Sequence, residues 1–190
     1  MRVVIGYESM YGNTRRVAEA VAAGFAPGHD LRIEPIANVD PTDPDLDVLV
    51  IGVPTHAHGL PRPSSRRAAA DGARTKQDVH QLEPSADAPG VREWLERLPD
   101  QVTFNSAAFD TRFRPPGWLV GHPARRISRV LHRHGATVLA PPASFFIDKH
   151  EELVTGELER AQEWGSHLCR LAERDQPSRR RGPQDAARQL

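Results

Sequence analysis

The chain has 190 residues, a length that predicts one domain of ordinary size with room for a buried core. Lys and Arg together number 25, as do Asp and Glu, so the formal net charge of zero gives no general argument for a nucleic-acid partner or an anionic membrane. The one cysteine, Cys169, excludes an internal disulfide and a cysteine-rich metal cluster and is typical of a reducing compartment. No apolar run is long enough to span a membrane, and the chain enters a strand directly instead of through a signal segment. We therefore expect a cytoplasmic protein that does not act at a membrane.

The first 25 residues predict a strand, a tight polar turn and a helix. Arg2 to Tyr7 is a short apolar strand, and an amphipathic helix follows at 13–25. A strand that feeds a helix through such a turn forms an anion site, because the unpaired N–H groups of the first helical turn and the macrodipole both favour negative charge. Gly12 would let a phosphate approach closely. Further side-chain donors are Ser9, Asn13 and Thr14. The alternative is an N-capped helix without a ligand.

The remaining elements predict an α/β protein with a doubly wound sheet, because strands alternate with helices. Pro35 places the second strand at an edge. No convincing helix separates the second strand from the third, and Pro141-Pro142 interrupts the last. Strands are expected at 31–36, 47–53, 101–109 and 136–146, and helices at 90–98, 123–134 and about 150–173.

Two segments differ in composition from this domain, which we expect to cover residues 1–173. Residues 61–89 contain hardly any apolar side chains and predict a flexible insertion at the ligand edge of the sheet. The insertion could act as a lid, and the alternative is a solvated loop with no role. Residues 174–190 predict a disordered tail, and the short Arg179-Arg180-Arg181 run is weak support for a nucleic-acid arm. We expect no nucleic-acid partner.

Three loops should meet at the carboxyl ends of the strands, where doubly wound sheets bind ligands. The first contains the turn described above, the second follows the buried strand at 47–53, and the third follows the strand at 101–109. The aromatic candidates for stacking are Phe109, Phe113 and Trp118, together with the imidazoles of His56 and His58. Core packing is the alternative for both phenylalanines, and a helix-packing corner is the alternative for Trp118.

The first loop lacks the G-x-x-x-x-G-K-S/T and G-x-G-x-x-G patterns of nucleotide-binding loops. It instead resembles the phosphate loop of the flavodoxin-like family, usually written S/T-x-S/T-G-N-T, with Tyr11 where a small hydroxyl residue is usual. Ser9-Met10-Tyr11-Gly12 is also similar to the loop of flavodoxin-like quinone reductases, and G-x-P-T at 52–55 is a further match. The resemblance covers about residues 1–173. It implies a flavodoxin-like five-stranded parallel sheet of order 2-1-3-4-5, helices on both faces, and FMN as cofactor.

By this resemblance, the cofactor would be held by residues of all three loops. The expected FMN-binding residues are Ser9, Met10, Tyr11, Gly12, Asn13 and Thr14, then Pro54, Thr55, His56 and Ala57, and then Phe109, Asp110, Thr111, Arg112 and Phe113.

Arg112 suggests how the chain would tune a flavin. A guanidinium near N1 and O2 of the ring would stabilise the anionic reduced form by Coulomb attraction, so Arg112→Ala would make the two-electron potential more negative. The alternative is that Asp110 and Arg112 only fasten the loop through a mutual or backbone pair.

Metal chemistry finds little support in the sequence. His56-x-His58 and His132-x-His134 lack a carboxylate or cysteine at useful spacing, and no histidine is expected beside Cys169 in the last helix. We therefore expect no metal site and no catalytic thiol, and the sequence identifies no catalytic acid or base.

The resemblance implies an FMN-binding redox protein that transfers electrons to a small-molecule or protein partner or reduces a small acceptor. One alternative is an NAD(P)H:quinone oxidoreductase, although the glycine-rich third loop of those enzymes is replaced here by Asp110-Thr111-Arg112. The other is a flavodoxin-like binding or regulatory module without redox turnover, or one that has lost its cofactor. Tyr11 and the small set of stacking residues favour that last alternative.

Overall fold

The computed structural model describes residues 1–55, 60–61, 82–113 and 121–180. The strands are β1 (Arg2–Tyr7), β2 (Asp30–Pro35), β3 (Val48–Pro54), β4 (Asn105–Phe113), β5 (Thr137–Val138) and β6 (Ala143–Ile147). The helices are α1 (Asn13–Ala23), the 3-10 turn η1 (Ile36–Asn38), α3 (Val91–Leu95), α4 (Pro123–Arg133) and α5 (Glu157–Arg180).

The strands form one parallel sheet of order β2-β1-β3-β4-β5, which confirms the predicted topology. The last predicted strand is divided into β5 and β6 on either side of Pro141-Pro142, and both pair with β4. Proline has no N–H to give to a strand ladder, which explains the interruption. β4 lies four residues later than expected because its register with β6 continues from Phe109 to Phe113.

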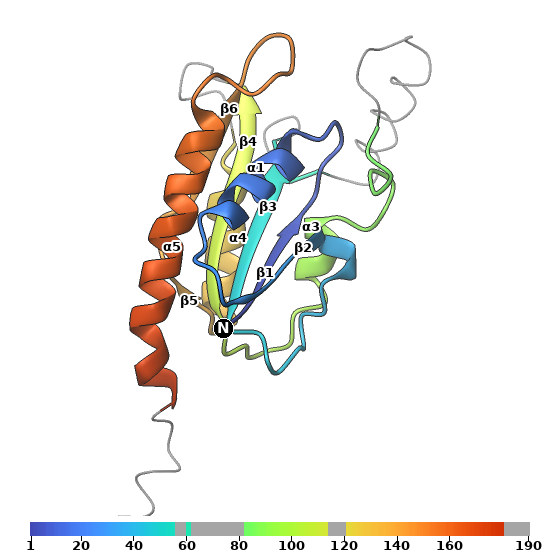
Figure 1. Ribbon diagram of the computed structural model, residues 1–190. Coiled ribbons are helices and arrows are strands. Elements are labelled where there is room, and N and C mark those ends of the chain that lie inside the picture. The colour runs from blue at the N-terminus through green and yellow to red at the C-terminus, as the bar shows by residue number, and fades with distance from the viewer. Residues whose placement is uncertain (56–59, 62–81, 114–120, 181–190) are drawn as a thin grey trace, which may run out of the picture.

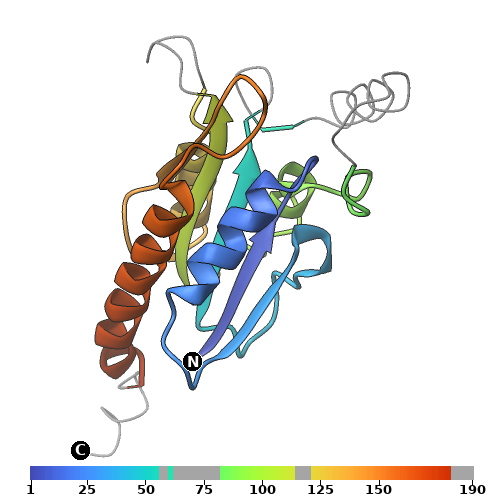
Figure 2. The same cartoon turned by 45° about the horizontal axis from the view of Figure 1, so that its top comes forward.

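Each face of the sheet has its own hydrophobic core. Val3 and Ile5 pack with α1 and α5, whereas Val4 and Leu49 pack with α3 and α4 around the buried Trp94. This alternation follows from the two-residue period of a strand. α1 and α5 lie in front of the sheet and α4 behind it, and the strands run upward to their carboxyl ends (Figures 1 and 2). The continuous apolar runs in β1 and β3 therefore serve two cores.

Two glycines bring α1 and α5 into close contact. A Cβ atom added at Gly165 would lie 2.1 Å from the carbonyl oxygen of Val21, and one added at Gly24 would lie 2.2 Å from the carbonyl oxygen of Gln162. The two backbones can approach this closely only because neither glycine has a side chain.

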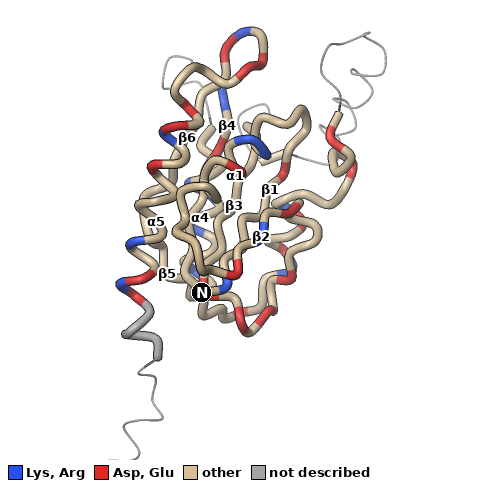
Figure 3. Tube along the Cα trace, viewed as in Figure 1, with Lys and Arg blue, Asp and Glu red and all other residues tan. Residues whose placement is uncertain are grey.

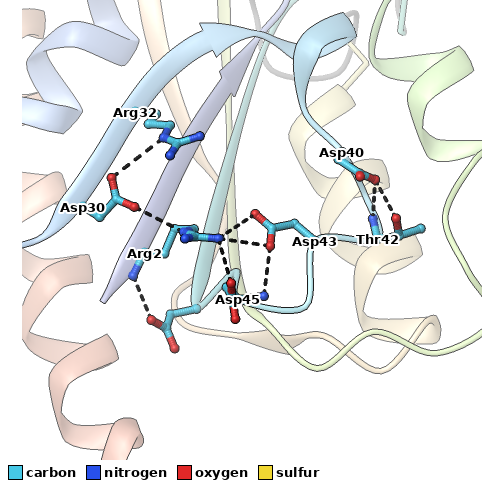
Figure 4. A network of polar contacts seen from close by, with 8 residues as sticks. Arg2, Asp30, Arg32, Asp40, Thr42, Asp43 and Asp45 are labelled. Atoms are coloured by element: carbon cyan, nitrogen blue, oxygen red, sulfur yellow. Dashed lines mark hydrogen bonds and ion pairs between the residues drawn. The ribbon is translucent and has the colours of Figure 1, made fainter.

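Ion pairs of Arg2, instead of a packed helix, fix the connection between β2 and β3. The Arg2 guanidinium lies 3.2 Å from Asp30, 3.3 Å from Asp43 and 3.2 Å from Asp45, and its backbone N–H donates to Asp47 (Figure 4). These contacts join the start of β1 to the loop that precedes β3. They explain how this connection is ordered although its described structure contains only η1.

Two expectations about chain segments differ from the structure. α5 begins at Glu157 instead of about residue 150, because residues 148–156 form a loop, and it continues to Arg180. Residues 174–180, expected to be disordered, are therefore helical, and the rest of the tail lies outside the described residues. Residues 62–81 of the expected insertion also lie outside them. The segment 82–89 packs against the first loop, where the N–H of Glu83 donates to the carbonyl of Met10.

Candidate functional site

A cavity of about 360 Å³ opens at the carboxyl ends of β1, β3 and β4. This volume lies in the usual range for small-molecule sites. Parts of all three predicted loops line the cavity, and the β6–α5 loop contributes as well. The lining residues are Ser9, Met10, Tyr11, Asn13, Thr14, Pro54, Thr55, Thr111, Phe113, Ile147 and Glu151.

The first loop has the backbone geometry of an anion site. Gly12 has a φ of +89°, a left-handed conformation that glycine adopts without strain, and its N–H donates to the Ser9 hydroxyl at 3.1 Å. α1 begins at the next residue, without a side-chain cap from Gly12 and without an acidic residue in its first turn. The first N–H groups of α1 therefore lie at the end of the helix that borders the cavity. The macrodipole favours an anion at this end.

A pair of hydroxyl groups joins the first loop to β4. The hydroxyl oxygens of Thr14 and Thr111 lie 2.8 Å apart, and both residues are almost fully buried. Each hydroxyl has one hydrogen, and one hydrogen suffices for the bond between them. The second hydrogen can therefore be directed at a ligand in the cavity.

The β6–α5 loop closes the cavity beside α1, and sequence reasoning missed its contribution. The Asn13 amide donates to the carbonyl of Glu151, which has a left-handed φ of 61°. The Asp148 carboxylate fixes this loop by accepting from the N–H groups of His150 and Glu152, and these bonds hold the pKa of Asp148 below its ordinary value. The polar run after β6 is the available signal, although the sequence pattern predicts that it begins the last helix.

Acidic side chains also lie near the first turn of α1. Glu83 accepts from the Arg15 guanidinium at 2.9 Å, and its carboxylate oxygen lies 3.1 Å from the position that a Cβ atom would take at Gly12. Arg16 pairs with Glu152 at 3.3 Å. Charged residues of both signs follow one another along the β6–α5 loop at the top of Figure 3. Each carboxylate in these two contacts is thus partly compensated by an arginine of α1.

Thr55 offers an unsatisfied polar atom to the cavity. Its N–H donates to the carbonyl of Thr111 at 2.9 Å, which holds the second loop against β4. Its hydroxyl oxygen is buried and has no hydrogen-bond partner in the described part of the chain. Since buried polar groups are almost always paired, this atom indicates a ligand or a bound water.

The apolar residues that line the cavity are Phe113, Pro54, Ile147 and Met10. The Phe113 residue is 47% exposed, which is high for a large apolar residue at the end of a buried strand. Four other predicted contributors, His56, Ala57, His58 and Trp118, lie outside the described residues.

Asp110 and Arg112 lie apart from the cavity, on the face of the sheet that α4 covers. The Asp110 carboxylate accepts from the N–H of Ala124 and lies 3.6 Å from the Arg112 guanidinium, which is also 2.8 Å from His122. Burial raises the pKa of Asp110, and burial followed by the charge of Arg112 lowers the pKa of His122. The role of Arg112 toward a flavin stays a prediction, and these contacts favour the alternative in which it fastens the loop.

Phe109 is a core residue and does not line the cavity. Its ring is fully buried, 5.7 Å from Phe145 and 6.1 Å from Trp164 between centroids, in edge-to-face contacts. Gly52 lies directly beneath it, because a Cβ atom there would be 2.2 Å from the ring. Phe109 could have stacked on a ligand or packed in the core, and these contacts are those of a core residue.

The sheet order defines a doubly wound α/β protein, and its cavity lies at the switch point between β1 and β3, where proteins of this class bind ligands. The flavodoxin family model matches residues 5–104, and the chain belongs to the flavodoxin family, whose members typically bind FMN. No curated protein matches the chain.

Several solved flavodoxins have a similar fold over nearly their whole length. Oxidised flavodoxin 1 from Bacillus cereus has a TM-score of 0.61 at 14% identity and covers 90% of this chain and 98% of its own. A flavodoxin from the domain Archaea has a TM-score of 0.60 at 15% identity, and the match covers 91% of this chain and 99% of that flavodoxin. A short-chain flavodoxin associated with a non-canonical PDU bacterial microcompartment has 0.62 at 16%, with 90% and 99% covered. At these identities the likeness concerns the fold. Within the described residues, no helix has the length and apolar character needed to cross a bilayer.

Proposed function

We propose that the protein binds FMN in the cavity at the carboxyl ends of β1, β3 and β4 and serves as a redox protein. The phosphate would lie at the N-terminus of α1, and the ring would lie toward Pro54, Thr55 and Phe113. The electron acceptor would be a protein partner or a small molecule. This assignment extends what is typical of the family to the residues of this chain.

The observation that carries the proposal is the first turn of α1. This turn directly follows Gly12, which has a left-handed conformation. It contains no acidic residue, and its residues Asn13 and Thr14 line the cavity. A phosphate dianion would satisfy its N–H groups and interact favourably with the macrodipole. The buried Thr55 hydroxyl is a second point of fit, because it lacks a partner in the described structure and could bond to a polar atom of the cofactor.

The chain's own residues would bind and orient the cofactor. The Thr14–Thr111 pair would donate its second hydroxyl hydrogen to the cofactor. The hydrogen bond between Asn13 and Glu151 would hold the loop from Ser9 to Thr14 rigid. Phe113 would cover part of the ring and exclude water from it. FMN itself, when bound, would supply the reversible transfer of electrons.

A visible spectrum tests the proposal. The purified protein, mixed with FMN and passed through a desalting column, should retain the yellow absorbance of oxidised flavin. Dithionite should bleach this absorbance, and reoxidation should restore it. A colourless protein that fails to take up added FMN would contradict the proposal.

The second candidate, a binding or regulatory module without FMN, is favoured by the position of Glu83. Its carboxylate lies beside Gly12, where it would repel a phosphate unless Arg15 compensates its charge. The same spectral test separates the two candidates, because a module without FMN would emerge colourless from the column.

Thr55→Val should weaken FMN binding without destabilising the ligand-free protein. The change removes a hydroxyl that has no partner in the described structure, so the free energy of unfolding should stay constant or rise slightly. If the hydroxyl bonds to the cofactor, its loss should raise the Kd for FMN about three- to tenfold, the value of one ordinary hydrogen bond. Fluorescence titration of FMN and urea unfolding measure the two quantities.

Thr55→Ser is the matched control for this experiment. It retains the hydroxyl and removes only a methyl group, so its affinity for FMN should remain near that of the wild type. An unchanged Kd in Thr55→Val would mean that the hydroxyl does not contact the cofactor.

A further inference from the structure

Three side chains with metal-binding atoms meet at the opposite end of the molecule from the cavity. The His29 Nε2 atom lies 3.5 Å from the Cys169 sulfur and 3.5 Å from a carboxylate oxygen of Glu173. The Cys169 sulfur lies 3.8 Å from the same oxygen. The sequence had led us to expect no histidine beside Cys169, and that expectation is wrong because the contact joins residues 140 positions apart.

The fold brings these groups together from two elements. Cys169 and Glu173 are one helical turn apart on α5, so their side chains share a face. His29 precedes β2 in the turn after α1, and its ring contacts Phe25 edge to face. Because α1 and α5 are packed closely through Gly24 and Gly165, the turn that carries His29 is held against α5.

The spacing of the three atoms fits a tetrahedral metal ion. In tetrahedral Zn²⁺ sites the metal lies about 2.3 Å from sulfur and about 2.0–2.1 Å from nitrogen or oxygen, which places neighbouring donor atoms about 3.3–3.6 Å apart. The observed separations of 3.5, 3.5 and 3.8 Å are within a few tenths of an ångström of these values. One ion could therefore contact all three donors after small rotations of the side chains.

Charge and exposure also suit a divalent ion. A thiolate and a carboxylate would neutralise the two positive charges, and the imidazole would bind in its neutral form. Cys169 is 3% exposed, whereas the Glu173 side chain is 50% exposed, so the cluster runs from the core to the solvent. The exposed side leaves room for water as a fourth ligand.

We propose that His29, Cys169 and Glu173 form a binding site for one Zn²⁺ ion, or a chemically similar divalent ion, that fastens the α1–β2 turn to α5. The site lies far from the cavity and does not depend on FMN. Its role is structural, because metal binding to the folded state alone stabilises that state.

Titration with Co²⁺ and Zn²⁺ of the full chain, reduced and freed of metal with a chelator, tests the proposal. The wild type should bind one Co²⁺ with a thiolate-to-cobalt charge-transfer band and the intense visible bands of tetrahedral cobalt. Zn²⁺ should displace the cobalt and raise the melting temperature. His29→Gln and Glu173→Gln should each lower the affinity at least tenfold, and Cys169→Ser should also abolish the charge-transfer band.

His167→Gln and Glu163→Gln are the matched controls, because both residues are exposed on α5 outside the cluster. Both variants should bind Co²⁺ as the wild type does. Glu173 is half exposed, so Glu173→Gln should fold and keep the test decisive even if Cys169→Ser does not. The absence of a charge-transfer band in the wild type, or undiminished binding in both His29→Gln and Glu173→Gln, would overturn the proposal.

Discussion

Gly12→Val should raise the Kd for FMN about ten- to a hundredfold, because a β-branched residue in a left-handed conformation costs on the order of 1–3 kcal/mol. The φ of +89° at Gly12 sets the path of the backbone from Ser9 into α1. Valine would relax the loop to another conformation in the ligand-free protein. FMN would then have to restore the strained conformation in order to reach the N–H groups of α1, and that cost would appear as lost affinity. Fluorescence titration of FMN measures it.

Gly28→Val is the matched control for backbone strain. Gly28 has a φ of +100°, and a Cβ atom there would meet nothing within 4 Å. It lies in the turn after α1, at the other end of that helix from the cavity. Gly28→Val should lower the free energy of unfolding by about as much as Gly12→Val does, and it should leave the affinity for FMN unchanged. Equal FMN affinities of Gly12→Val and the wild type would show that the cofactor does not depend on this turn.

Gly165→Ala should lower the free energy of unfolding by about 2–3 kcal/mol, the upper part of the range for overpacking a core. On an isolated helix the same change would stabilise by about 1 kcal/mol, because alanine has the higher helix propensity. Here the added Cβ would lie 2.1 Å from the carbonyl oxygen of Val21, so α1 and α5 must separate. The clash is with backbone, which cannot rotate away. Urea unfolding measures the difference.

Gly24→Ala should act in the same direction, since its Cβ would lie 2.2 Å from the carbonyl oxygen of Gln162. The double variant should lose less stability than the two single losses added together, because one separation of the helices relieves both clashes. Glu163→Ala, an exposed change on α5, should alter stability by less than about 0.5 kcal/mol. A gain in stability for Gly165→Ala would contradict the close packing of the two helices.

The local sequence predicts most of the fold because its signals are strong and short in range. The apolar runs in β1 and β3 give both strands and their burial, and Pro141-Pro142 marks where the last strand divides. The start of α5 was misplaced because Asp148 organises a loop through hydrogen bonds to backbone N–H groups, which leave no periodic pattern. Helix boundaries of this kind depend on such contacts more than on composition.

The candidate site was predictable where its residues belong to the three loops at the carboxyl ends of β1, β3 and β4, since Pro54, Thr55, Thr111 and Phe113 were expected there together with the first loop. The turn from Ser9 to Thr14 carries a recognisable motif, and the structure places it at the cavity. Glu151 and Ile147 could not be found in this way, because their position depends on how β6 pairs with β4. Phe109 was ambiguous because an aromatic residue near the end of a strand can pack in a core or against a ligand. It shares its face of β4 with Thr111 and Phe113, which line the cavity, but it lies deeper along the strand, where Phe145 and Trp164 pack around its ring.

The comparison of FMN with riboflavin tests the central claim most directly, because the two ligands differ only in the phosphate. If the first turn of α1 binds the dianion, FMN should bind at least about a hundredfold more tightly, the equivalent of one or two charge-assisted hydrogen bonds. Titrations of both ligands against the same protein preparation give the ratio of their Kd values. Equal Kd values would contradict the account, since the N-terminus of α1 would then contribute nothing to recognition of the cofactor.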